Sequence, residues 1–235
     1  ASSPIIRGVA LVNLDETYEK DVDTIPNEQL LEICAIAHMY SQTFRFIHEE
    51  EFRSWLTRNH IILNSFSDSS GQWLNESDSL VEIGPGLGAM ISLNQRSNLK
   101  RIYSLDTYEM HSIFNAIVRK FPDGYSKYSP ISVNDSRVSK PFEINEANLT
   151  VLAFWSLTEL KYEERSEYLE VLKSAKKILI GTNEKFEGIN NFEYIENLAN
   201  SLGMNFTWKS LEDVFKSELP KYQRKHRIYL LQESE

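Results

Sequence analysis

The sequence predicts a doubly wound α/β fold: a mostly parallel seven-stranded sheet with helices on both faces, preceded by an N-terminal helical cap. Short apolar runs alternate with amphipathic stretches through the second part of the chain, a glycine-rich turn follows the first run, and two helix-like segments come before it. Strands that alternate with helices are typical of parallel sheets with right-handed crossovers.

The N-terminal helices are predicted from the spacing of their apolar residues. Asn27 to His38 has a broad apolar face, and Phe44 to Arg58 has apolar residues on one side and charged residues on the other. The following stretch, Asn64 to Asp78, is rich in Ser, Asn, Asp and Gly, which is typical of a loop. We place the domain boundary there, with a helical cap over residues 1–72 and an α/β domain over residues 73–235.

Beyond this boundary, the apolar runs have the length of strands, and the segments between them have helical spacing. Small ligands of such folds bind outside the carboxyl ends of the strands, near the point where the strand order reverses. The predicted strands are Ser79–Ile83, Arg101–Leu105, Tyr128–Val133, Leu149–Phe154, Lys177–Thr182, Asn205–Trp208 and His226–Leu231. The predicted helices lie near Met90 and over Tyr108–Phe121, Tyr162–Ala175 and Phe192–Leu202.

Composition and charge narrow the class of protein. The chain has 235 residues, of which 41% are hydrophobic, and a net charge of −9. This charge disfavours a nucleic-acid partner, which needs several Lys or Arg contacts to its phosphates. We interpret the basic run of Lys221, Arg224, Lys225 and Arg227 as a solvated turn.

Features of secretion and membrane insertion are also missing from the sequence. Cys34 is the single cysteine, so no intrachain disulfide can form. No apolar run has the roughly 18 to 20 residues that cross a bilayer, and the N-terminus lacks a signal pattern. We therefore expect a cytoplasmic protein without a transmembrane segment.

A glycine loop follows the first predicted strand. From Glu82 the sequence is E-I-G-P-G-L-G, so that Gly84, Gly86 and Gly88 occupy alternate positions. Glycines at these places permit a tight turn and let backbone amides approach a ligand with no Cβ in the way. Dinucleotide loops more usually have the spacing G-x-G-x-x-G. Here the spacing is G-x-G-x-G, with a carboxylate two residues before the first glycine.

An acid, Asp106, ends the second predicted strand about 20 residues after the glycine loop, at the spacing expected for a ribose ligand in folds of this kind. Its carboxylate could accept hydrogen bonds from both ribose hydroxyls. Asp is also a favoured N-cap, so Asp106 could instead cap the helix that begins near Thr107. The two roles can coexist.

Residues 79–106 resemble motif I and the following strand of the class I S-adenosylmethionine-dependent methyltransferases, which have a Rossmann-like fold. The resemblance implies a Rossmann-like methyltransferase domain over residues 73–235 with S-adenosylmethionine as its cofactor. It further implies that Glu82 acts toward the methionine ammonium, matching the positive charge of the cofactor. The implied cofactor residues in this segment are Glu82, Gly84, Pro85, Gly86, Gly88, Asp106 and Thr107.

Later strand ends supply further candidates for the cofactor site. In the same family a polar residue after the third strand meets the adenine amino group, which indicates Asn134 or Asp135, although a plain turn explains the pair equally well. Phe154 and Trp155 could wall the adenine or a sugar, because aromatic faces suit both. Core packing is the competing interpretation for Phe154.

The segment after the fourth strand bears on the methyl acceptor. Ser156 to Leu160 reads S-L-T-E-L, which resembles the S-F-S-E-M loop of a group of sugar O-methyltransferases but departs from it at Leu157 and Leu160. The glycine loop also resembles that of ribosomal-RNA adenine dimethyltransferases. Those enzymes carry an Asn/Asp-Pro-Pro-aromatic or Asn-Leu-Pro-Tyr motif, which is absent here.

These resemblances imply O-methylation of a sugar hydroxyl, on a surface glycan or a nucleotide sugar, with a small-molecule or glycan acceptor as the partner. Methylation of an RNA adenine or of another small molecule is the alternative activity. A catalytically inactive module that binds S-adenosylmethionine or serves as a scaffold is the non-enzymatic alternative.

O-methylation also needs a group that removes the hydroxyl proton. Glu159 is the first candidate, although a Glu in a first helical turn also favours the helix N-terminus, and His60 near the cap is the second. We predict no required metal, because no acid and His residues show a metal-binding spacing. Tyr40, Phe44 and Arg45 could close over the pocket or form a helix–core interface.

Overall fold

The computed structural model describes residues 27–44, 47–67, 79–94, 99–120, 125–215 and 225–233. Arg45, Lys221, Arg224 and residues 68–78 of the predicted loop lie outside the described residues. Within the described parts, no helix is long and apolar enough to cross a membrane.

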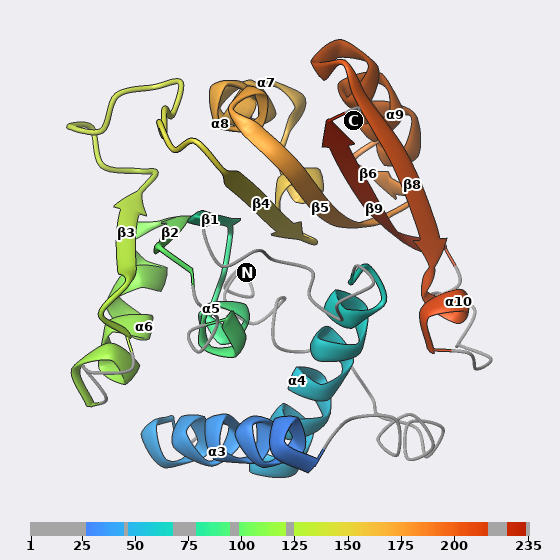
Figure 1. The fold of residues 1–235 in the computed structure, drawn as a ribbon. Helices are drawn as coiled ribbons and strands as arrows, with labels where there is room; N and C mark the ends of the chain where they lie inside the picture. Colours follow the sequence, from blue (N-terminus) through green and yellow to red (C-terminus); the bar gives the residue numbers. More distant parts are fainter. Residues whose placement is uncertain are drawn as a thin grey trace.

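A seven-stranded sheet in the order β3-β2-β1-β4-β5-β9-β8 forms the centre of the molecule (Figure 1). The strands from β3 to β5 are mutually parallel, whereas β9 is antiparallel to both of its neighbours. The predicted doubly wound, mostly parallel seven-stranded sheet is therefore confirmed. The strands are β1 Ser79–Ile83, β2 Arg101–Asp106, β3 Tyr128–Ser132, β4 Leu149–Phe154, β5 Ala175–Asn183, β8 Met204–Ser210 and β9 His226–Glu233.

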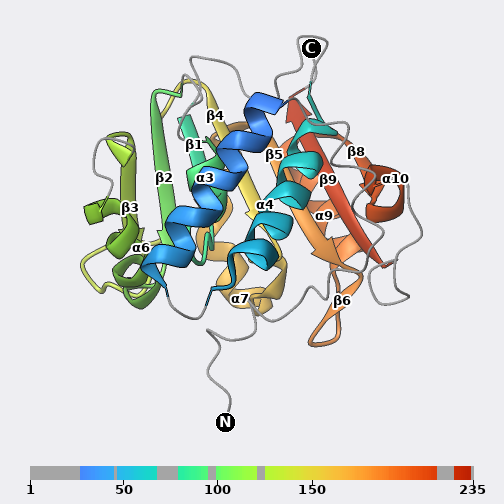
Figure 2. The ribbon, with the colours of Figure 1, turned by 90° about the horizontal axis from the view of Figure 1, so that it is seen from below.

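Helices cover both faces of the sheet, and each face has its own apolar cluster. On one face, Tyr40 and Leu56 pack with Leu80 of β1; on the other, Tyr168 and Ile195 pack with strand residues. Figure 2 shows α3 and α4 lying across the first face. The helices are α3 Asn27–Thr43, α4 Glu49–Asn64, α5 Ala89–Asn94, α6 Tyr108–Lys120, α7 Tyr162–Arg165, α8 Leu169–Lys173, α9 Asn191–Leu202 and α10 Leu211–Phe215.

Burial on both faces explains why the central strands β1 and β4 appear in the sequence as mainly apolar runs. All of β1 is buried, including Glu82, and β4 is buried up to Phe154, its last residue. The strand order reverses between these two strands, because β2 lies on one side of β1 and β4 on the other. Their carboxyl ends therefore form the crevice in which folds of this type bind ligands.

Several elements differ from the prediction. α4 begins at Glu49 and ends at Asn64, later than predicted, with three acids in its first turn, where they favour the helix N-terminus. The predicted helix over Tyr162–Ala175 is interrupted by the 3-10 turn η4, Ser166–Tyr168. At that turn the Phe142 N–H donates to the Glu167 carbonyl at 2.9 Å, which gives that carbonyl a partner outside the helix. A hairpin of β6 Lys185–Phe186 and β7 Ile189–Asn190 was not predicted.

Candidate functional site

The glycine loop leaves β1 in a conformation that glycine favours. Gly84, Gly86 and Gly88 all have positive φ, of 64°, 59° and 74°. A Cβ on Gly88 would lie 2.4 Å from the Phe114 ring, whereas a Cβ on Gly86 would meet no atom within 4 Å. Gly88 is thus required by the close approach of α6, and Gly86 borders open space.

Asp106, at the end of β2, contacts this loop directly. One carboxylate oxygen accepts a hydrogen bond from the Gly86 N–H at 2.9 Å, and the other accepts from the Thr107 N–H at 2.7 Å. Burial raises the pKa of Asp106, and these two N–H donors oppose the rise. The Thr107 hydroxyl, rather than Asp106, accepts from the Met110 N–H in the first turn of α6.

Glu82 lies beneath the loop and is 4% exposed. Its Oε2 atom is buried without a hydrogen-bond partner among the described residues. Burial, and secondly the charge of Asp106, raises the pKa of Glu82 to about 8, against the effect of a hydrogen bond from the Ile91 backbone. Buried carboxylates need a cation or hydrogen-bond donors. A positively charged ligand group would therefore satisfy this site.

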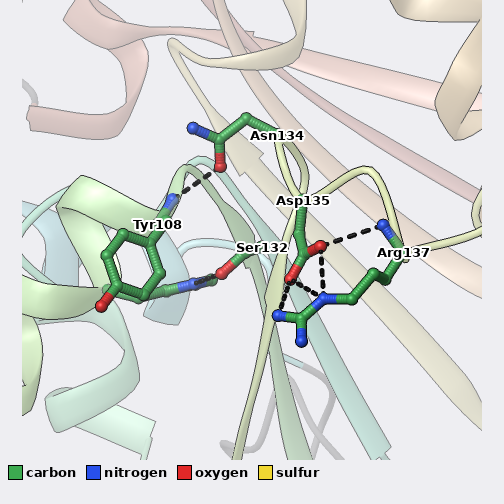
Figure 3. Close-up of polar contacts among 6 residues, drawn as sticks. Tyr108, Ser132, Asn134, Asp135 and Arg137 are labelled. Atoms are coloured by element: carbon green, nitrogen blue, oxygen red, sulfur yellow. Dashed lines mark hydrogen bonds and ion pairs between the residues drawn. The ribbon is translucent and has the colours of Figure 1, made fainter.

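The turn after β3 holds Asn134 and Asp135, whose side chains already have partners (Figure 3). Asn134 accepts a hydrogen bond from the Tyr108 N–H at 2.9 Å and donates to Glu109, so it caps α6. The Arg137 side chain donates to Asp135 and holds the pKa of that carboxyl at about 2. Local structure thus accounts for both residues, and their contact with adenine stays a prediction.

Phe154, the last residue of β4, and Trp155, which follows it, have different neighbours. A Cβ on Gly181 would lie 3.0 Å from the Phe154 ring, so Phe154 packs on β5 as the core interpretation predicts. Trp155 has a positive φ of 49°. Its indole N–H donates to Nδ1 of His226, the first residue of β9, at 3.0 Å.

The segment after Trp155 joins the glycine loop. The Ser156 hydroxyl donates to the Ile83 carbonyl, and its Cβ occupies the space that a side chain on Gly84 would need. The short 3-10 helix η3, Leu157–Glu159, follows. Glu159 is exposed there, and partial burial of its carboxyl group raises its pKa. The β1 and β4 loops therefore meet, three residues from Glu159.

A buried arginine that the sequence analysis missed holds this segment. Arg165 is 1% exposed and donates to the carbonyls of Thr158 and Leu160, at 2.7 and 3.0 Å. It also donates to the Asn191 side chain at 2.9 Å, which in turn donates to Asn183 at the end of β5. In the sequence Arg165 is one charged residue among the charged residues of a helix, so no local signal marks it.

The structure does not bring His60 to this edge. The His60 ring is hydrogen bonded to Gln29 and Asn64, at 2.7 and 2.8 Å. Gln29 lies 11 residues before Tyr40 on α3, about 16 Å along the helix, and it is Tyr40 that contacts the glycine loop. His60 belongs to the junction of α3 and α4, and we do not assign it a catalytic role.

Tyr40 lies beneath the glycine loop rather than over the pocket. It is fully buried, and its hydroxyl lies 2.7 Å from the Leu87 carbonyl and 3.0 Å from Ser92. Phe44, also buried, packs in the same cluster. Both residues fit the predicted helix–core interface.

Among the residues that the structure describes, no group of three or more His, Cys, Asp or Glu side chains could hold a metal ion.

Comparison with solved structures agrees with this fold. The methyltransferase domain of a bacterial protein, CtHen1-C, superposes with a TM-score of 0.56 at 10% identity and covers 77% of this chain and 100% of its own. A second structure of that domain, CtHen1-CN, gives 0.53 at 13%, with coverages of 76% and 97%. A chain from the complex of a methyltransferase with the Haloferax volcanii Trm112 methyltransferase activator gives 0.51 at 14%, with coverages of 90% and 100%.

No family model matches the sequence, and a search of curated proteins finds no match. At these identities the superpositions establish the architecture alone. The chain therefore has the Rossmann-like fold of methyltransferases.

Proposed function

We propose that the chain is an S-adenosylmethionine-dependent methyltransferase that methylates a sugar hydroxyl, on a surface glycan or a nucleotide sugar. The observation that carries the cofactor assignment is the orphaned Oε2 of Glu82, buried below a glycine loop that is open at Gly86. Glu82 would bind the methionine ammonium, and Asp106 the ribose hydroxyls. The resemblance of Ser156–Leu160 to sugar O-methyltransferases supports the acceptor class.

When bound, the cofactor supplies an electrophilic methyl group on a sulfonium. The acceptor oxygen forms the new bond to the methyl carbon, the carbon–sulfur bond breaks, and S-adenosylhomocysteine leaves with the electron pair. The hydroxyl proton must pass to a base. Glu159 is our candidate, because it follows the loop that packs on Gly84 and its raised pKa suits a proton acceptor.

Calorimetric titration with S-adenosylmethionine tests the cofactor assignment. The native protein should bind it, and Asp106→Ala should bind on the order of 100-fold more weakly, because two hydrogen bonds to a charged group are lost. Glu170→Gln is the matched control, since Glu170 makes an exposed ion pair with Lys173 on α8. A folded native protein that does not bind the cofactor would refute the proposal.

Transfer of a radiolabelled methyl group tests the acceptor. At least one of glucose, UDP-glucose and UDP-glucuronate should be methylated. An adenine-containing RNA oligonucleotide should not be labelled, because binding a phosphate backbone needs several Lys or Arg contacts, which the net charge of −9 disfavours. Labelling of RNA but of no sugar would overturn the sugar assignment. Glu159→Gln should abolish most turnover while leaving cofactor affinity unchanged, and undiminished turnover would exclude Glu159 as the base.

A further inference from the structure

A tryptophan–histidine pair lies beside the candidate methyl-transfer site, and its histidine, His226, has no role in the function proposed above. Trp155 is the first residue after β4, and His226 is the first residue of β9. His226 pairs with Asn183, the last residue of β5. The pair therefore lies at the edge of the sheet where the carboxyl ends of β4 and β5 are found, next to Ser156 of the loop that covers Gly84.

The hydrogen bond within the pair determines which nitrogen of His226 carries the proton. An indole N–H can only donate, so Nδ1 of His226 must be the unprotonated acceptor of the 3.0 Å bond from Trp155. The neutral ring then carries its hydrogen on Nε2. Among the described residues, Nε2 has no hydrogen-bond partner. His226 as a whole residue is half-buried.

The surroundings keep the ring neutral. Burial lowers the pKa of His226, and the cationic Arg58 on α4 lowers it further. Protonation of Nδ1 would also break the bond from Trp155. His226 is therefore unsuited to act as the proton acceptor of the reaction, since the nitrogen that could reach a ligand already holds its hydrogen.

The backbone of Trp155 supports a functional role for the pair. A φ of 49° is rare for a bulky residue, and such conformations cost on the order of 1 to 3 kcal/mol and concentrate at ligand sites. In this conformation the Trp155 N–H bonds to the Gly181 carbonyl at 2.8 Å. The indole ring lies 5.8 Å from the His226 ring, between centroids.

We propose that His226 orients the methyl acceptor by donating a hydrogen bond from Nε2–H to an oxygen next to the methylated hydroxyl. This inference rests on the proposed function and deepens it. Trp155 is a positioning residue, because it acts by holding the tautomer of His226. The ligand class is a polyol such as a sugar, in which a second oxygen adjoins the reacting one. The hydroxyl proton goes elsewhere, to Glu159 or to water.

Long-range ¹H–¹⁵N NMR spectra of the histidine rings test the tautomer without any acceptor. In the native protein His226 should appear neutral at pH 7 with its hydrogen on Nε2. Trp155→Phe removes the indole donor, and the His226 signals should then shift toward a mixture of tautomers. A native His226 that carries its hydrogen on Nδ1, or that is doubly protonated at pH 7, would overturn the proposal.

The same spectra test the contact with the acceptor. Glucose, UDP-glucose and UDP-glucuronate are added in turn to protein saturated with S-adenosylhomocysteine. At least one should move the Nε2–H resonance of His226 while leaving the ring resonances of His38 unchanged, because His38 is exposed on α3 and paired with Glu49. If no sugar moves it, His226 does not contact a polyol acceptor and the proposal fails.

Two substitutions distinguish the contributions of the two ring nitrogens of His226 to the kinetics of methyl transfer. His226→Gln places an amide donor near Nε2, whereas His226→Asn keeps an acceptor near Nδ1 only. For the sugar that shifts His226, we expect a KM about 10-fold higher for His226→Asn, partial rescue in His226→Gln, and no change in His38→Gln. Cofactor affinity by calorimetry should stay native in all three variants. Loss of cofactor binding in one variant alone would indicate that this variant is misfolded, whereas failure of the proposed function would appear as a native protein that does not bind the cofactor. Equal KM values in both His226 variants and the native enzyme would refute the orienting role.

Discussion

Two carboxyl groups share the bottom of the candidate cofactor site, but they have different partners. Asp106 accepts two backbone N–H hydrogen bonds, which favour its ionised form. Glu82 accepts one, from Ile91, and has an oxygen without a partner among the described residues. Without a cationic ligand, Glu82 is therefore the carboxyl that remains protonated at neutral pH.

This difference predicts a pH effect on the cofactor-free protein. Below about pH 4.5 Glu82 is protonated in both the folded and the unfolded chain. Between its ordinary pKa of 4.5 and its folded pKa of about 8, only the unfolded chain ionises, so stability falls as the pH rises. At pH 8, Glu82→Gln should raise the free energy of unfolding by on the order of 2 kcal/mol.

Urea unfolding at pH 5 and pH 8 measures this effect. The difference between Glu82→Gln and the native protein should be larger at pH 8 than at pH 5. Glu170→Gln, at an exposed ion pair, should show no such pH dependence. An equal difference in the free energy of unfolding between Glu82→Gln and the native protein at both pH values would mean that the folded pKa of Glu82 is not raised.

Substitutions of two loop glycines should have different effects on stability and on cofactor binding. Gly88→Ala should cost about 3 kcal/mol or more, because its Cβ would collide with Phe114 in a conformation that is itself unfavourable. Gly86→Ala should cost about 1 kcal/mol, since its Cβ meets no described atom. It should nevertheless weaken S-adenosylmethionine binding at least about 10-fold by occupying the space above the loop. Thermal unfolding and calorimetry measure the two effects, and native affinity in Gly86→Ala would place the cofactor elsewhere.

At the scale of elements, the sheet could be predicted closely and the helices less so. β1 and β4 have the predicted bounds because both faces of each strand are buried, which leaves a short, mainly apolar run in the sequence. The sequence predicts α7 and α8 as one helix, whereas the structure has the turn η4 between them. At that turn, the hydrogen bond between Phe142 and Glu167 joins residues 25 apart. Local periodicity carries no information about such a contact.

In the candidate site too, residues marked by local sequence spacing could be predicted, and contacts between distant elements could not. Glu82, Asp106 and the glycines were predicted because their spacing along the chain reflects one βαβ unit. Arg165 was missed because its partners lie on other elements. His60 lies at the junction of α3 and α4, because one of its two partners, Gln29, is on α3. The sequence indicates which residues lie at the strand ends, but the contacts between loops depend on tertiary packing and cannot be predicted from it.

Because Tyr40 of α3 contacts the glycine loop, we expect a change in α3 to affect cofactor binding as well as stability. Tyr40→Phe removes the hydroxyl that contacts the Leu87 carbonyl and Ser92, and leaves these buried groups with fewer partners. We expect a loss of about 1 to 3 kcal/mol in stability. Cofactor affinity should fall several-fold as well, because Leu87 lies within the loop.

Chemical denaturation and calorimetry measure these two losses. Tyr162→Phe is the control, since Tyr162 is 64% exposed and an exposed substitution should change stability by no more than about 0.5 kcal/mol. Reduced stability of Tyr40→Phe with native cofactor affinity would show that α3 supports the core without positioning the loop.

At the scale of the whole molecule, the N-terminal helices and the sheet share one apolar cluster. Tyr40 and Leu56, both fully buried, belong to the cluster that contains Leu80 of β1 and Leu179 of β5. Full burial of a large apolar side chain contributes about 1.5 to 3 kcal/mol, and net stability is only about 5 to 15 kcal/mol. Removing α3 and α4 would therefore expose part of this cluster, including residues that α5, α6 and α10 do not cover alone.

We therefore expect that residues 73–235, expressed alone, will not fold cooperatively, although the composition of the sequence predicts a domain boundary before residue 73. The fragment should bind a hydrophobic dye, lose its near-ultraviolet circular dichroism and fail to bind S-adenosylmethionine. Co-expression with residues 1–72 should restore a soluble complex, because the two parts complete one core. A monomeric fragment with a cooperative unfolding transition and native cofactor affinity would instead establish the helices as a separate cap, and α3 would then influence the site only through Tyr40.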